Sequence, residues 1–231
     1  MSALLVRKGW QMITFFFDLD GTLVDPKEGI TSAIQFALEK MGARDIPHAD
    51  DLTWCIGPPL WPSFEVLLGP GADLDEAVGY YREFYTDEGM YMADVYDGVG
   101  EMFDALHQVE ARMFVATSKP HTYAQEIIEH FGIHAHVERL FGSELDGTNS
   151  DKTDLLKFAL DETGADPARS VMVGDRRFDI FGARNNDIPS VGALWGYADA
   201  DELHMAEADG LAGAPEEVPE VAFDLLGLMD E

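Results

Sequence analysis

The pattern of hydrophobic and polar positions divides the chain into an alternating part and a helical insertion. Residues 13–17 form a short β-branched and aromatic run, which is typical of a strand covered on both faces in a parallel sheet. Between residues 26 and 94, apolar side chains recur at the i, i+3 and i+4 spacing of amphipathic helices. From residue 95 onward, helical and strand patterns alternate until about residues 193–196. This alternation predicts an α/β fold with a doubly wound parallel sheet.

Two apolar stripes predict helices inside the insertion. The first covers residues 30–41 and is closed by Gly42, a residue type that often follows the end of a helix. The second covers residues 77–85 and is largely aromatic. Because aromatic side chains at helical spacing are more typical of packed interiors than of ligand sites, we expect this stripe to form the core of the insertion. The stripes consist of Ile30, Ile34, Ala37, Leu38 and Met41, and of Ala77, Tyr80, Tyr81, Phe84 and Tyr85.

Two carboxylates follow the first predicted strand. Asp18 and Asp20 lie two positions apart, so an extended backbone points both side chains the same way, and Gly21 permits a sharp turn after them. In open α/β sheets, ligands bind outside the carboxyl ends of the strands. Two like charges this close favour a cation or a shared proton, and Mg²⁺ prefers carboxylate and phosphate oxygens. The pair therefore indicates a metal-assisted site, and the alternative is an ordinary surface turn.

Three further polar segments follow in chain order. A predicted strand over residues 114–116 leads into two hydroxyls and a cation, and a lysine precedes an amphipathic stretch over residues 155–160. A second buried-type strand, over residues 171–173, leads into a glycine and two aspartates. The polar side chains of these segments are Thr117, Ser118, Lys119, Lys152, Asp175 and Asp179.

Together, the four segments resemble the four motifs of the haloacid dehalogenase-like (HAD) hydrolases. The resemblance implies that Asp18 is the nucleophile and that Asp20 is the general acid and base. The phosphate-binding residues it implies are Gly21, Thr22, Thr117, Ser118 and Lys152. The Mg²⁺ ligands it implies are Asp18, the backbone carbonyl of Asp20, Asp175, and Asp179 through water or as an orienting residue. Because Thr153 and Asp154 depart from the lysine motif of close relatives, Lys157 is the alternative to Lys152.

The resemblance also implies the domain organisation and the reaction. A Rossmann-like HAD core is expected over residues 1–25 and 95–231, with a small all-helical C1 cap over residues 26–94 as a mobile lid. Residues 56–60, 81–89, 95–99 and 174–176 resemble the phosphoglycolate phosphatase-like branch. This implies a Mg²⁺-dependent phosphatase that hydrolyses a small, phosphoglycolate-like phosphomonoester through an aspartyl-phosphate. Possible substrate contacts are Gly57, Pro58, Pro59, Lys119 and Arg177.

Several alternatives stay open. Members of this branch also hydrolyse nucleoside monophosphates and pyrophosphate, so a 5'-nucleotidase or a pyrophosphatase is possible. A β-phosphoglucomutase-like isomerase uses the same four motifs. A non-catalytic scaffold would be expected to have lost a motif residue, whereas Asp18, Asp20, Lys152 and Asp175 are all present. Similarity of fold does not decide among these functions.

The charge of the chain restricts its partners. Acidic residues number 44 against 15 basic ones, which gives a net charge of −29. Such an excess repels nucleic acid and anionic membranes, so we expect neither as a partner. The same field opposes an anionic substrate, and the small phosphorylated partner is implied by the resemblance alone. The sequence leaves a monomer and a weak homodimer equally open. The acidity favours a halophilic source, because a Debye length of about 3 Å at 1 M salt screens the repulsion. An ordinary acidic protein is the alternative.

The remaining features favour a cytoplasmic protein. Cys55 is the one cysteine, which excludes an internal disulfide and suits a reducing compartment. No apolar run is long enough to span a membrane. The first apolar stretch is too short for a signal peptide and precedes its basic residues. We expect residues 1–11 to be a dispensable extension, because Met12 directly opens the first strand.

Overall fold

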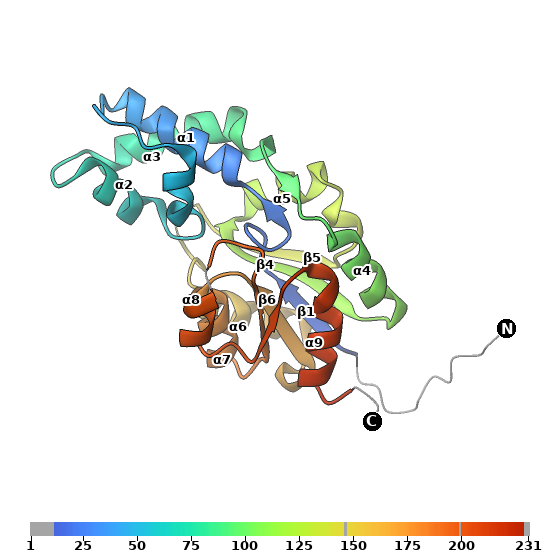
Figure 1. Cartoon of the computed structure of the whole chain (residues 1–231). Coiled ribbons are helices and arrows are strands. Elements are labelled where there is room, and N and C mark those ends of the chain that lie inside the picture. Colours follow the sequence, from blue (N-terminus) through green and yellow to red (C-terminus); the bar gives the residue numbers. More distant parts are fainter. Residues whose placement is uncertain (1–11, 146, 199, 229–231) are drawn as a thin grey trace.

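A six-stranded parallel sheet forms the centre of the molecule (Figure 1). The computed structural model describes residues 12–145, 147–198 and 200–228. The strand order is β5-β4-β1-β6-β7-β8, so β1 lies between β4 and β6. The strands are β1 (Thr14–Phe17), β4 (Arg112–Pro120), β5 (Arg139–Ser143), β6 (Ser170–Gly174), β7 (Ser190–Ala193) and β8 (Gly210–Ala212). This arrangement confirms the predicted doubly wound α/β fold.

Helices cover both faces of the sheet, which explains the uninterrupted apolar run of β1. Phe15 and Phe17 pack toward one face, and Phe16 packs into a separate core on the other. The first face is covered by α4 (Val99–Gln108), α5 (His121–His130) and α9 (Val218–Leu225). The second is covered by α6 (Lys152–Thr163) and α7 (Arg177–Asn185), and α8 (Ala200–Met205) packs beside α7. Strand side chains alternate between faces, so each phenylalanine fills one of these two interiors.

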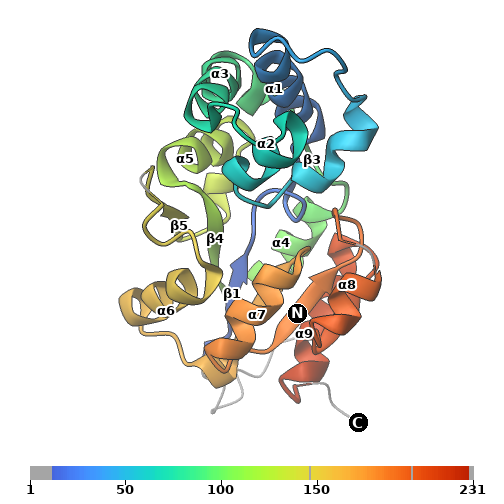
Figure 2. The same cartoon turned by 90° about the vertical axis from the view of Figure 1, so that its left-hand side faces the viewer.

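The helical insertion lies between two short antiparallel strands, β2 (Val24–Asp25) and β3 (Asp94–Val95). Figures 1 and 2 show it beside one end of the sheet. It consists of α1 (Lys27–Lys40), η1 (Ala49–Cys55), α2 (Leu60–Leu68), α3 (Leu74–Asp87) and η2 (Gly89–Tyr91). Gly29 lets α1 approach η2 closely, since a Cβ atom there would lie 1.8 Å from the carbonyl oxygen of Gly89.

One part of the chain differs from the sequence-based expectation. The sheet continues beyond residues 193–196 into β8, a three-residue strand whose Gly-Leu-Ala sequence carries no strand pattern. The C-terminal helix α9 has Pro219 in its first turn, a position where proline loses no helical hydrogen bond. Three further 3-10 segments connect the elements: η3 (Ile133–Ala135), η4 (Pro167–Arg169) and η5 (Pro215–Glu217).

Two expectations concern the membrane and the N-terminus. Among the helices that the structure describes, none combines the length and the apolar character needed to cross a bilayer. The expected extension over residues 1–11 lies outside the described residues.

Candidate active site

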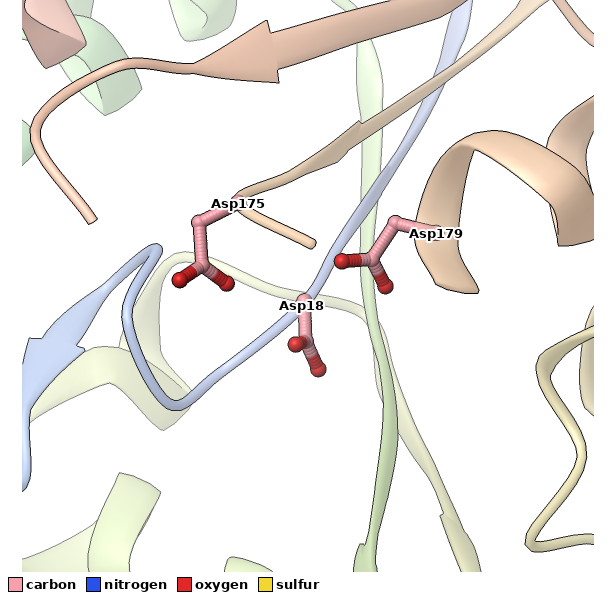
Figure 3. A group of neighbouring side chains, drawn as sticks. All are labelled: Asp18, Asp175 and Asp179. Carbon is pink, nitrogen blue, oxygen red and sulfur yellow. The ribbon is translucent and has the colours of Figure 1, made fainter. Parts of the chain in front are cut away.

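Three aspartates meet at one edge of the sheet (Figure 3). Asp18 follows β1, Asp175 follows the neighbouring β6, and Asp179 lies in the first turn of α7. Each offers one oxygen, and these atoms all lie within 4.8 Å of one another. Asp175 and Asp179 are only 1% exposed. Because β1 and β6 run parallel side by side, their ends bring residues 157 positions apart into one cluster.

The cluster is electrostatically suited to a cation. Burial, reinforced by the charges of Asp179 and Asp18, raises the pKa of Asp175 well above its usual value. Burial also raises the pKa of Asp179 to about 6. Asp175 Oδ2 accepts a 2.8 Å hydrogen bond from the backbone N–H of Tyr197, whereas its buried Oδ1 has no partner among the described residues. Hard carboxylate oxygens with an unpartnered buried lone pair fit an ion such as Mg²⁺.

Lys152 is a cation beside two of the three aspartates, Asp18 and Asp179. It is the first residue of α6, where the Asp151 side chain caps the helix by accepting from Thr153 N. Its Nζ atom donates to Asp18 Oδ1 and to the carbonyl of Ala116, both over 2.9 Å. The same atom lies 2.8 Å from Asp179 Oδ1, close enough for an ion pair but without the angles of a hydrogen bond.

The charges around Lys152 distinguish it from Lys157. Burial would lower the pKa of the Lys152 ammonium, but the Asp179 and Asp18 carboxylates outweigh this effect and raise the pKa above its ordinary value. Lys157 is exposed and pairs with Asp161 on the surface of α6. Of the two lysines that the sequence left open, the structure therefore brings Lys152 to the aspartates.

Asp20 is held by a second lysine. Lys119 Nζ lies 2.6 Å from Asp20 Oδ2 and 2.5 Å from the hydroxyl of Tyr85, a residue of α3 in the helical insertion. Burial raises the pKa of Asp20, and the opposing effect of Lys119 does not cancel this shift. The other Asp20 oxygen, Oδ1, is buried and has no hydrogen-bond partner among the described residues.

The turn after Asp20 is packed against the aspartate cluster. Gly21 has φ of +83°, and a Cβ atom there would lie 2.3 Å from Asp175 Oδ2, so a larger residue cannot occupy this position without displacement. Thr22 is buried, and its hydroxyl has no partner among the described residues. Trp195 Nε1 donates to the Thr22 carbonyl over 3.0 Å and so fixes the turn.

The hydroxyl segment at the end of β4 lies at the same edge of the sheet. Thr117 is buried, and its hydroxyl accepts a 3.2 Å hydrogen bond from the backbone N–H of Lys119. The carbonyl of Ser118 accepts from the Ser143 hydroxyl over 2.8 Å. This bond ties the last residues of β4 to β5.

A cavity of about 700 Å³ opens between the sheet edge and the helical insertion. Its polar lining includes Asp18, Asp20, Thr117, Ser118, Lys119, Lys152 and Asp179. Its aromatic lining consists of Trp61, Tyr81, Tyr85, Tyr123, Phe178 and Phe181. Gly21, Thr22 and Asp175 lie outside this lining, in the layer that supports it. The pocket is therefore polar at the carboxylates and has aromatic side chains among its other lining residues.

The structure places four of the five expected substrate contacts in the lining of the cavity. Gly57, Pro58, Pro59 and Lys119 line the cavity. Arg177 does not; it is exposed, with its guanidinium 4.9 Å from the centre of the Phe178 ring. Its neighbour Arg176 lines the cavity instead, because its side chain turns inward to donate to the carbonyl of Ile56 over 2.5 Å.

Sequence reasoning missed the contributions of Tyr81 and Tyr85. Both are buried in the helical insertion, as expected, but both also line the cavity. Their i, i+4 spacing was the available signal, and it could not separate a packed interior from a pocket wall. Arg176 lies in a segment that resembles the phosphoglycolate phosphatase-like branch, but its contact with Ile56 could not be predicted, because it depends on how distant segments pack together. The same holds for the contacts of Tyr197.

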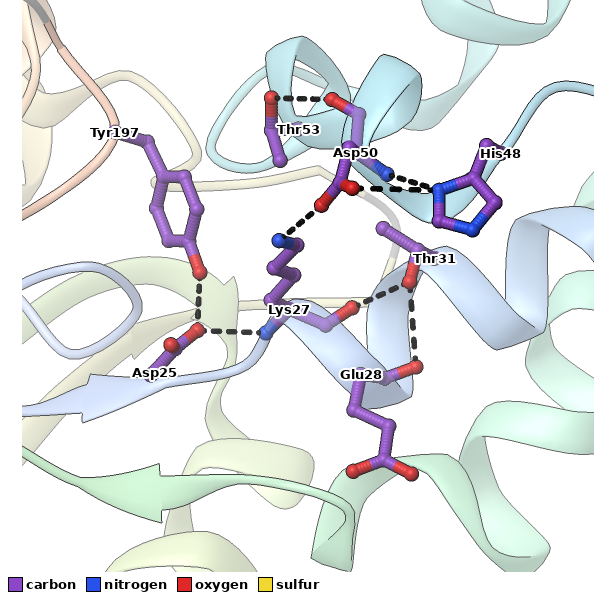
Figure 4. A network of polar contacts seen from close by, with 8 residues as sticks. All are labelled: Asp25, Lys27, Glu28, Thr31, His48, Asp50, Thr53 and Tyr197. Carbon is purple, nitrogen blue, oxygen red and sulfur yellow. Dashed lines mark hydrogen bonds and ion pairs between the residues drawn. The ribbon is translucent and has the colours of Figure 1, made fainter.

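Tyr197 connects the aspartate cluster to the base of the helical insertion. Its backbone N–H donates to Asp175, and its hydroxyl donates to Asp25 in β2, where the network of Figure 4 begins. Asp25 Oδ1 also accepts from the backbone N–H of Lys27 over 3.0 Å, and Lys27 Nζ binds Asp50 over 2.5 Å. The polar network thus runs from the sheet edge into α1 and η1.

Comparison with known proteins decides the family. Residues 15–193 match the family model described as haloacid dehalogenase-like hydrolase. The chain belongs to this family. The predicted family and its phosphatase chemistry are confirmed at this level, and the structure has the six-stranded core expected of a HAD hydrolase.

Three relatives show the range of names within the family. A 5'-nucleotidase of Pseudomonas aeruginosa is 43% identical over 188 residues, covering 81% of this chain and 85% of the relative. A tyrosine-protein kinase PtkA of Mycobacterium tuberculosis is 40% identical over 185 residues, covering 80% of this chain but 63% of that longer relative. A phosphoglycolate phosphatase of Agrobacterium fabrum is 29% identical, covering 82% and 83% of the two chains.

A solved structure agrees with the fold. The crystal structure of a predicted phosphatase from Clostridium acetobutylicum superposes with a TM-score of 0.84 at 32% identity. The match covers 94% of this chain and 100% of that one. The similarity therefore extends through the helical insertion as well as the sheet.

Proposed function

We propose that this HAD hydrolase is a Mg²⁺-dependent phosphatase that hydrolyses a small phosphomonoester through an aspartyl-phosphate on Asp18. The observation that carries this proposal is the position of Asp18, which lines the cavity, belongs to the acidic cluster and accepts a hydrogen bond from Lys152. Phosphoryl transfer depends mainly on positioning and on stabilising the charge of the transferred group. A carboxylate held between a cation and a metal-ligand cluster meets both requirements.

Asp18 and Asp20 divide the chemistry in this proposal. Asp18 attacks phosphorus in line, and the bond between phosphorus and the leaving oxygen breaks. Asp20 donates its proton to that oxygen, then removes a proton from the water that hydrolyses the aspartyl-phosphate. The raised pKa of Asp20 and its unpartnered Oδ1 support a role in proton transfer, since a group that both donates and accepts protons needs a pKa nearer to neutrality.

The remaining residues bind the phosphoryl group and the cation. Lys152, Thr117, Ser118 and the backbone amides of Gly21 and Thr22 are proposed to contact the phosphoryl oxygens. Asp18, Asp175, Asp179 and the Asp20 carbonyl are proposed to hold Mg²⁺. When bound, the ion supplies positive charge that keeps Asp18 ionised and stabilises the transferring phosphoryl group.

The helical insertion is proposed to act as a cap over residues 26–94, with the core over residues 1–25 and 95–231. Support comes from the β2/β3 ribbon, through which the chain enters and leaves the insertion. The cavity between insertion and sheet edge also suits a lid that excludes water from an acyl-phosphate.

The size and lining of the cavity favour a second candidate substrate. Phosphoglycolate is the substrate in the names of two relatives, but it would fill a small part of the cavity of about 700 Å³. Aromatic walls suit the stacking of a planar base, and the relative at 43% identity is named a 5'-nucleotidase. A nucleoside 5'-monophosphate is therefore the second candidate for the leaving group.

The setting of the protein also belongs to this proposal. The protein is proposed to be a cytoplasmic monomer or weak homodimer that acts on a small phosphorylated molecule. Its net charge of −29 supports the proposal that it binds neither nucleic acid nor anionic membranes.

A phosphate-release panel tests the proposal. Phosphoglycolate, nucleoside 5'-monophosphates, pyrophosphate and p-nitrophenyl phosphate are compared with and without Mg²⁺. Release from at least one monoester that stops with a chelator supports a metal-dependent phosphatase, and the ratio of kcat/KM values identifies the substrate class. Conversion of glucose 1-phosphate in the presence of its bisphosphate, without net phosphate release, would instead show a mutase. No release and no conversion from any compound would favour the scaffold alternative.

A further inference from the structure

Two lysines contact the two carboxylates to which the chemistry is assigned. Lys152 contacts Asp18, the proposed nucleophile, and Lys119 contacts Asp20, the proposed proton-transfer group. The side chain of Lys119 is only 7% exposed, and its ammonium lies among Asp20, Tyr85 and the cavity. A lysine buried this way is engaged by protein groups before any substrate arrives, so its first role is to hold them.

The contact fixes the orientation of the Asp20 carboxyl group. Oδ2 is bound by Lys119 over 2.6 Å, whereas Oδ1 is buried and has no hydrogen-bond partner among the described residues. Buried carboxylate oxygens normally have partners, so an unpartnered one is a candidate for a hydrogen bond with a bound molecule. With Oδ2 occupied, Oδ1 is the atom left to exchange a proton with the leaving oxygen or with water.

Lys119 is in turn held by the helical insertion. The Tyr85 hydroxyl accepts a hydrogen bond from Nζ over 2.5 Å, and the same ammonium lies 4.8 Å from the centre of the Tyr85 ring. Tyr85 has little freedom, because its ring stacks on Tyr81 at 5.3 Å and meets Tyr123 of α5 edge-on at 6.2 Å. A rigid aromatic anchor on α3 therefore sets the position of a lysine on β4.

We propose that Lys119 is a positioning residue that aligns Asp20 for proton transfer, and that Tyr85 couples this alignment to the placement of the helical insertion over the site. The inference rests on the proposed phosphatase function. A direct role of Lys119 in substrate binding would raise KM. A positioning role would instead slow the two chemical steps, because Asp20 would be misaligned.

The two steps respond differently to the loss of alignment. With p-nitrophenyl phosphate, the leaving group departs without a proton, so formation of the aspartyl-phosphate is spared. Hydrolysis of that intermediate still needs Asp20 as a base. Lys119→Met, which keeps the length of the side chain without its charge, should therefore give a burst of p-nitrophenolate followed by slow turnover. An alkyl phosphate, whose leaving oxygen needs the proton, should show no burst.

The experiment compares burst and steady-state kinetics for Lys119→Met, Tyr85→Phe and the double variant at saturating Mg²⁺. We expect Lys119→Met to lower kcat by roughly 10- to 100-fold, and Tyr85→Phe by about 3- to 10-fold, as for a misplaced catalytic group. KM should stay nearly unchanged for the alkyl phosphate. For p-nitrophenyl phosphate KM should fall together with kcat, because hydrolysis of the aspartyl-phosphate then limits turnover. Because Tyr85 acts through Lys119, the double variant should be no slower than Lys119→Met.

Two control variants remove a lysine ammonium and a tyrosine hydroxyl that lie outside the cavity. Lys157→Met deletes an exposed lysine on α6, and Tyr80→Phe deletes a hydroxyl on α3 that contacts Glu76 outside the cavity. Neither should change kcat or KM. If Lys119→Met does not fold, Tyr85→Phe still tests the coupling, because it removes one hydroxyl and keeps the ring.

The outcomes separate the inference from the proposed function. A rise in KM with unchanged kcat and no burst would assign Lys119 to substrate binding and overturn the inference, as would additive losses in the double variant. If the wild-type protein is active and the variants behave in this contrary way, the phosphatase assignment still stands. A wild-type protein that releases no phosphate from any monoester would instead refute the proposed function.

Discussion

Lys152 donates a 2.9 Å hydrogen bond to Oδ1 of Asp18, joining the start of α6 to the end of β1 across 134 positions of sequence. The same ammonium is 2.8 Å from Asp179, so one cation lies between two carboxylates. This relationship determines the charge balance of the site, because removing the lysine leaves the buried Asp179 and the partly buried Asp18 without this compensating charge.

Lys152→Met should lower kcat by on the order of 100-fold, since a fixed cation next to the transferred group contributes mainly in the transition state. Its thermal midpoint without Mg²⁺ should also fall, because breaking a buried ion pair costs about 3 kcal/mol or more. Phosphate release and thermal unfolding are measured beside Lys157→Met, which removes an exposed lysine of the same helix. Equal behaviour of the two variants would contradict the role given to Lys152.

Mg²⁺ should raise the thermal midpoint of the protein. An ion present at 100 times its Kd stabilises the folded state by about 2.7 kcal/mol through mass action. Asp175→Asn should lose most of this gain, because it removes one carboxylate of the cluster. Asp161→Asn, which changes an exposed aspartate paired with Lys157, is the control and should keep the gain. A full shift in Asp175→Asn would show that the ion binds elsewhere.

The metal-free protein should gain stability as the pH falls from about 7 toward about 4. Burial raises the pKa of Asp179 to about 6, above the usual value of 3.8. Between these values the folded state binds a proton that the unfolded state does not, so the free energy of unfolding rises as the pH falls. Asp179→Asn, measured by chemical denaturation with chelator present, should show a shallower pH slope. Superimposable slopes would argue against a raised pKa in the folded state.

High KCl should raise the thermal midpoint if the acidity is a salt adaptation. The net charge of −29 produces self-repulsion, and the Debye length falls from about 10 Å at 0.1 M to about 3 Å at 1 M. Mg²⁺ is held saturating while KCl is varied, so that specific ion binding does not contribute. A midpoint that is flat or falling over this range would refute the halophilic interpretation and leave the phosphatase proposal intact.

The sequence predicted those parts of the site that follow from strand order. Asp18, Asp175 and Thr117 each follow an apolar strand, and the ends of neighbouring parallel strands meet at one edge of a sheet. Lys152 could be placed because a helix begins there, although Lys157 stayed open until the structure showed it on the surface.

The parts that could not be predicted depend on tertiary packing. The contact between Tyr85 and Lys119 requires the helical insertion to lie over β4, which no local pattern specifies. Arg176 turns into the cavity and Arg177 faces outward, although the two are adjacent and chemically identical. Strand β8 is held by pairing with β7, and its three residues have no signal of their own.

Trapping the phosphorylated intermediate tests the central claim most directly. Asp20→Asn keeps the nucleophile but cannot act as the base, so the aspartyl-phosphate should accumulate from p-nitrophenyl phosphate. Acid quenching and intact-mass measurement should then show one added phosphoryl group, and borohydride reduction followed by peptide mapping should locate it at Asp18. The double variant with Asp18→Asn should carry no adduct. A phosphoryl group on any other residue, or turnover by Asp18→Asn within tenfold of the wild type, would contradict the account.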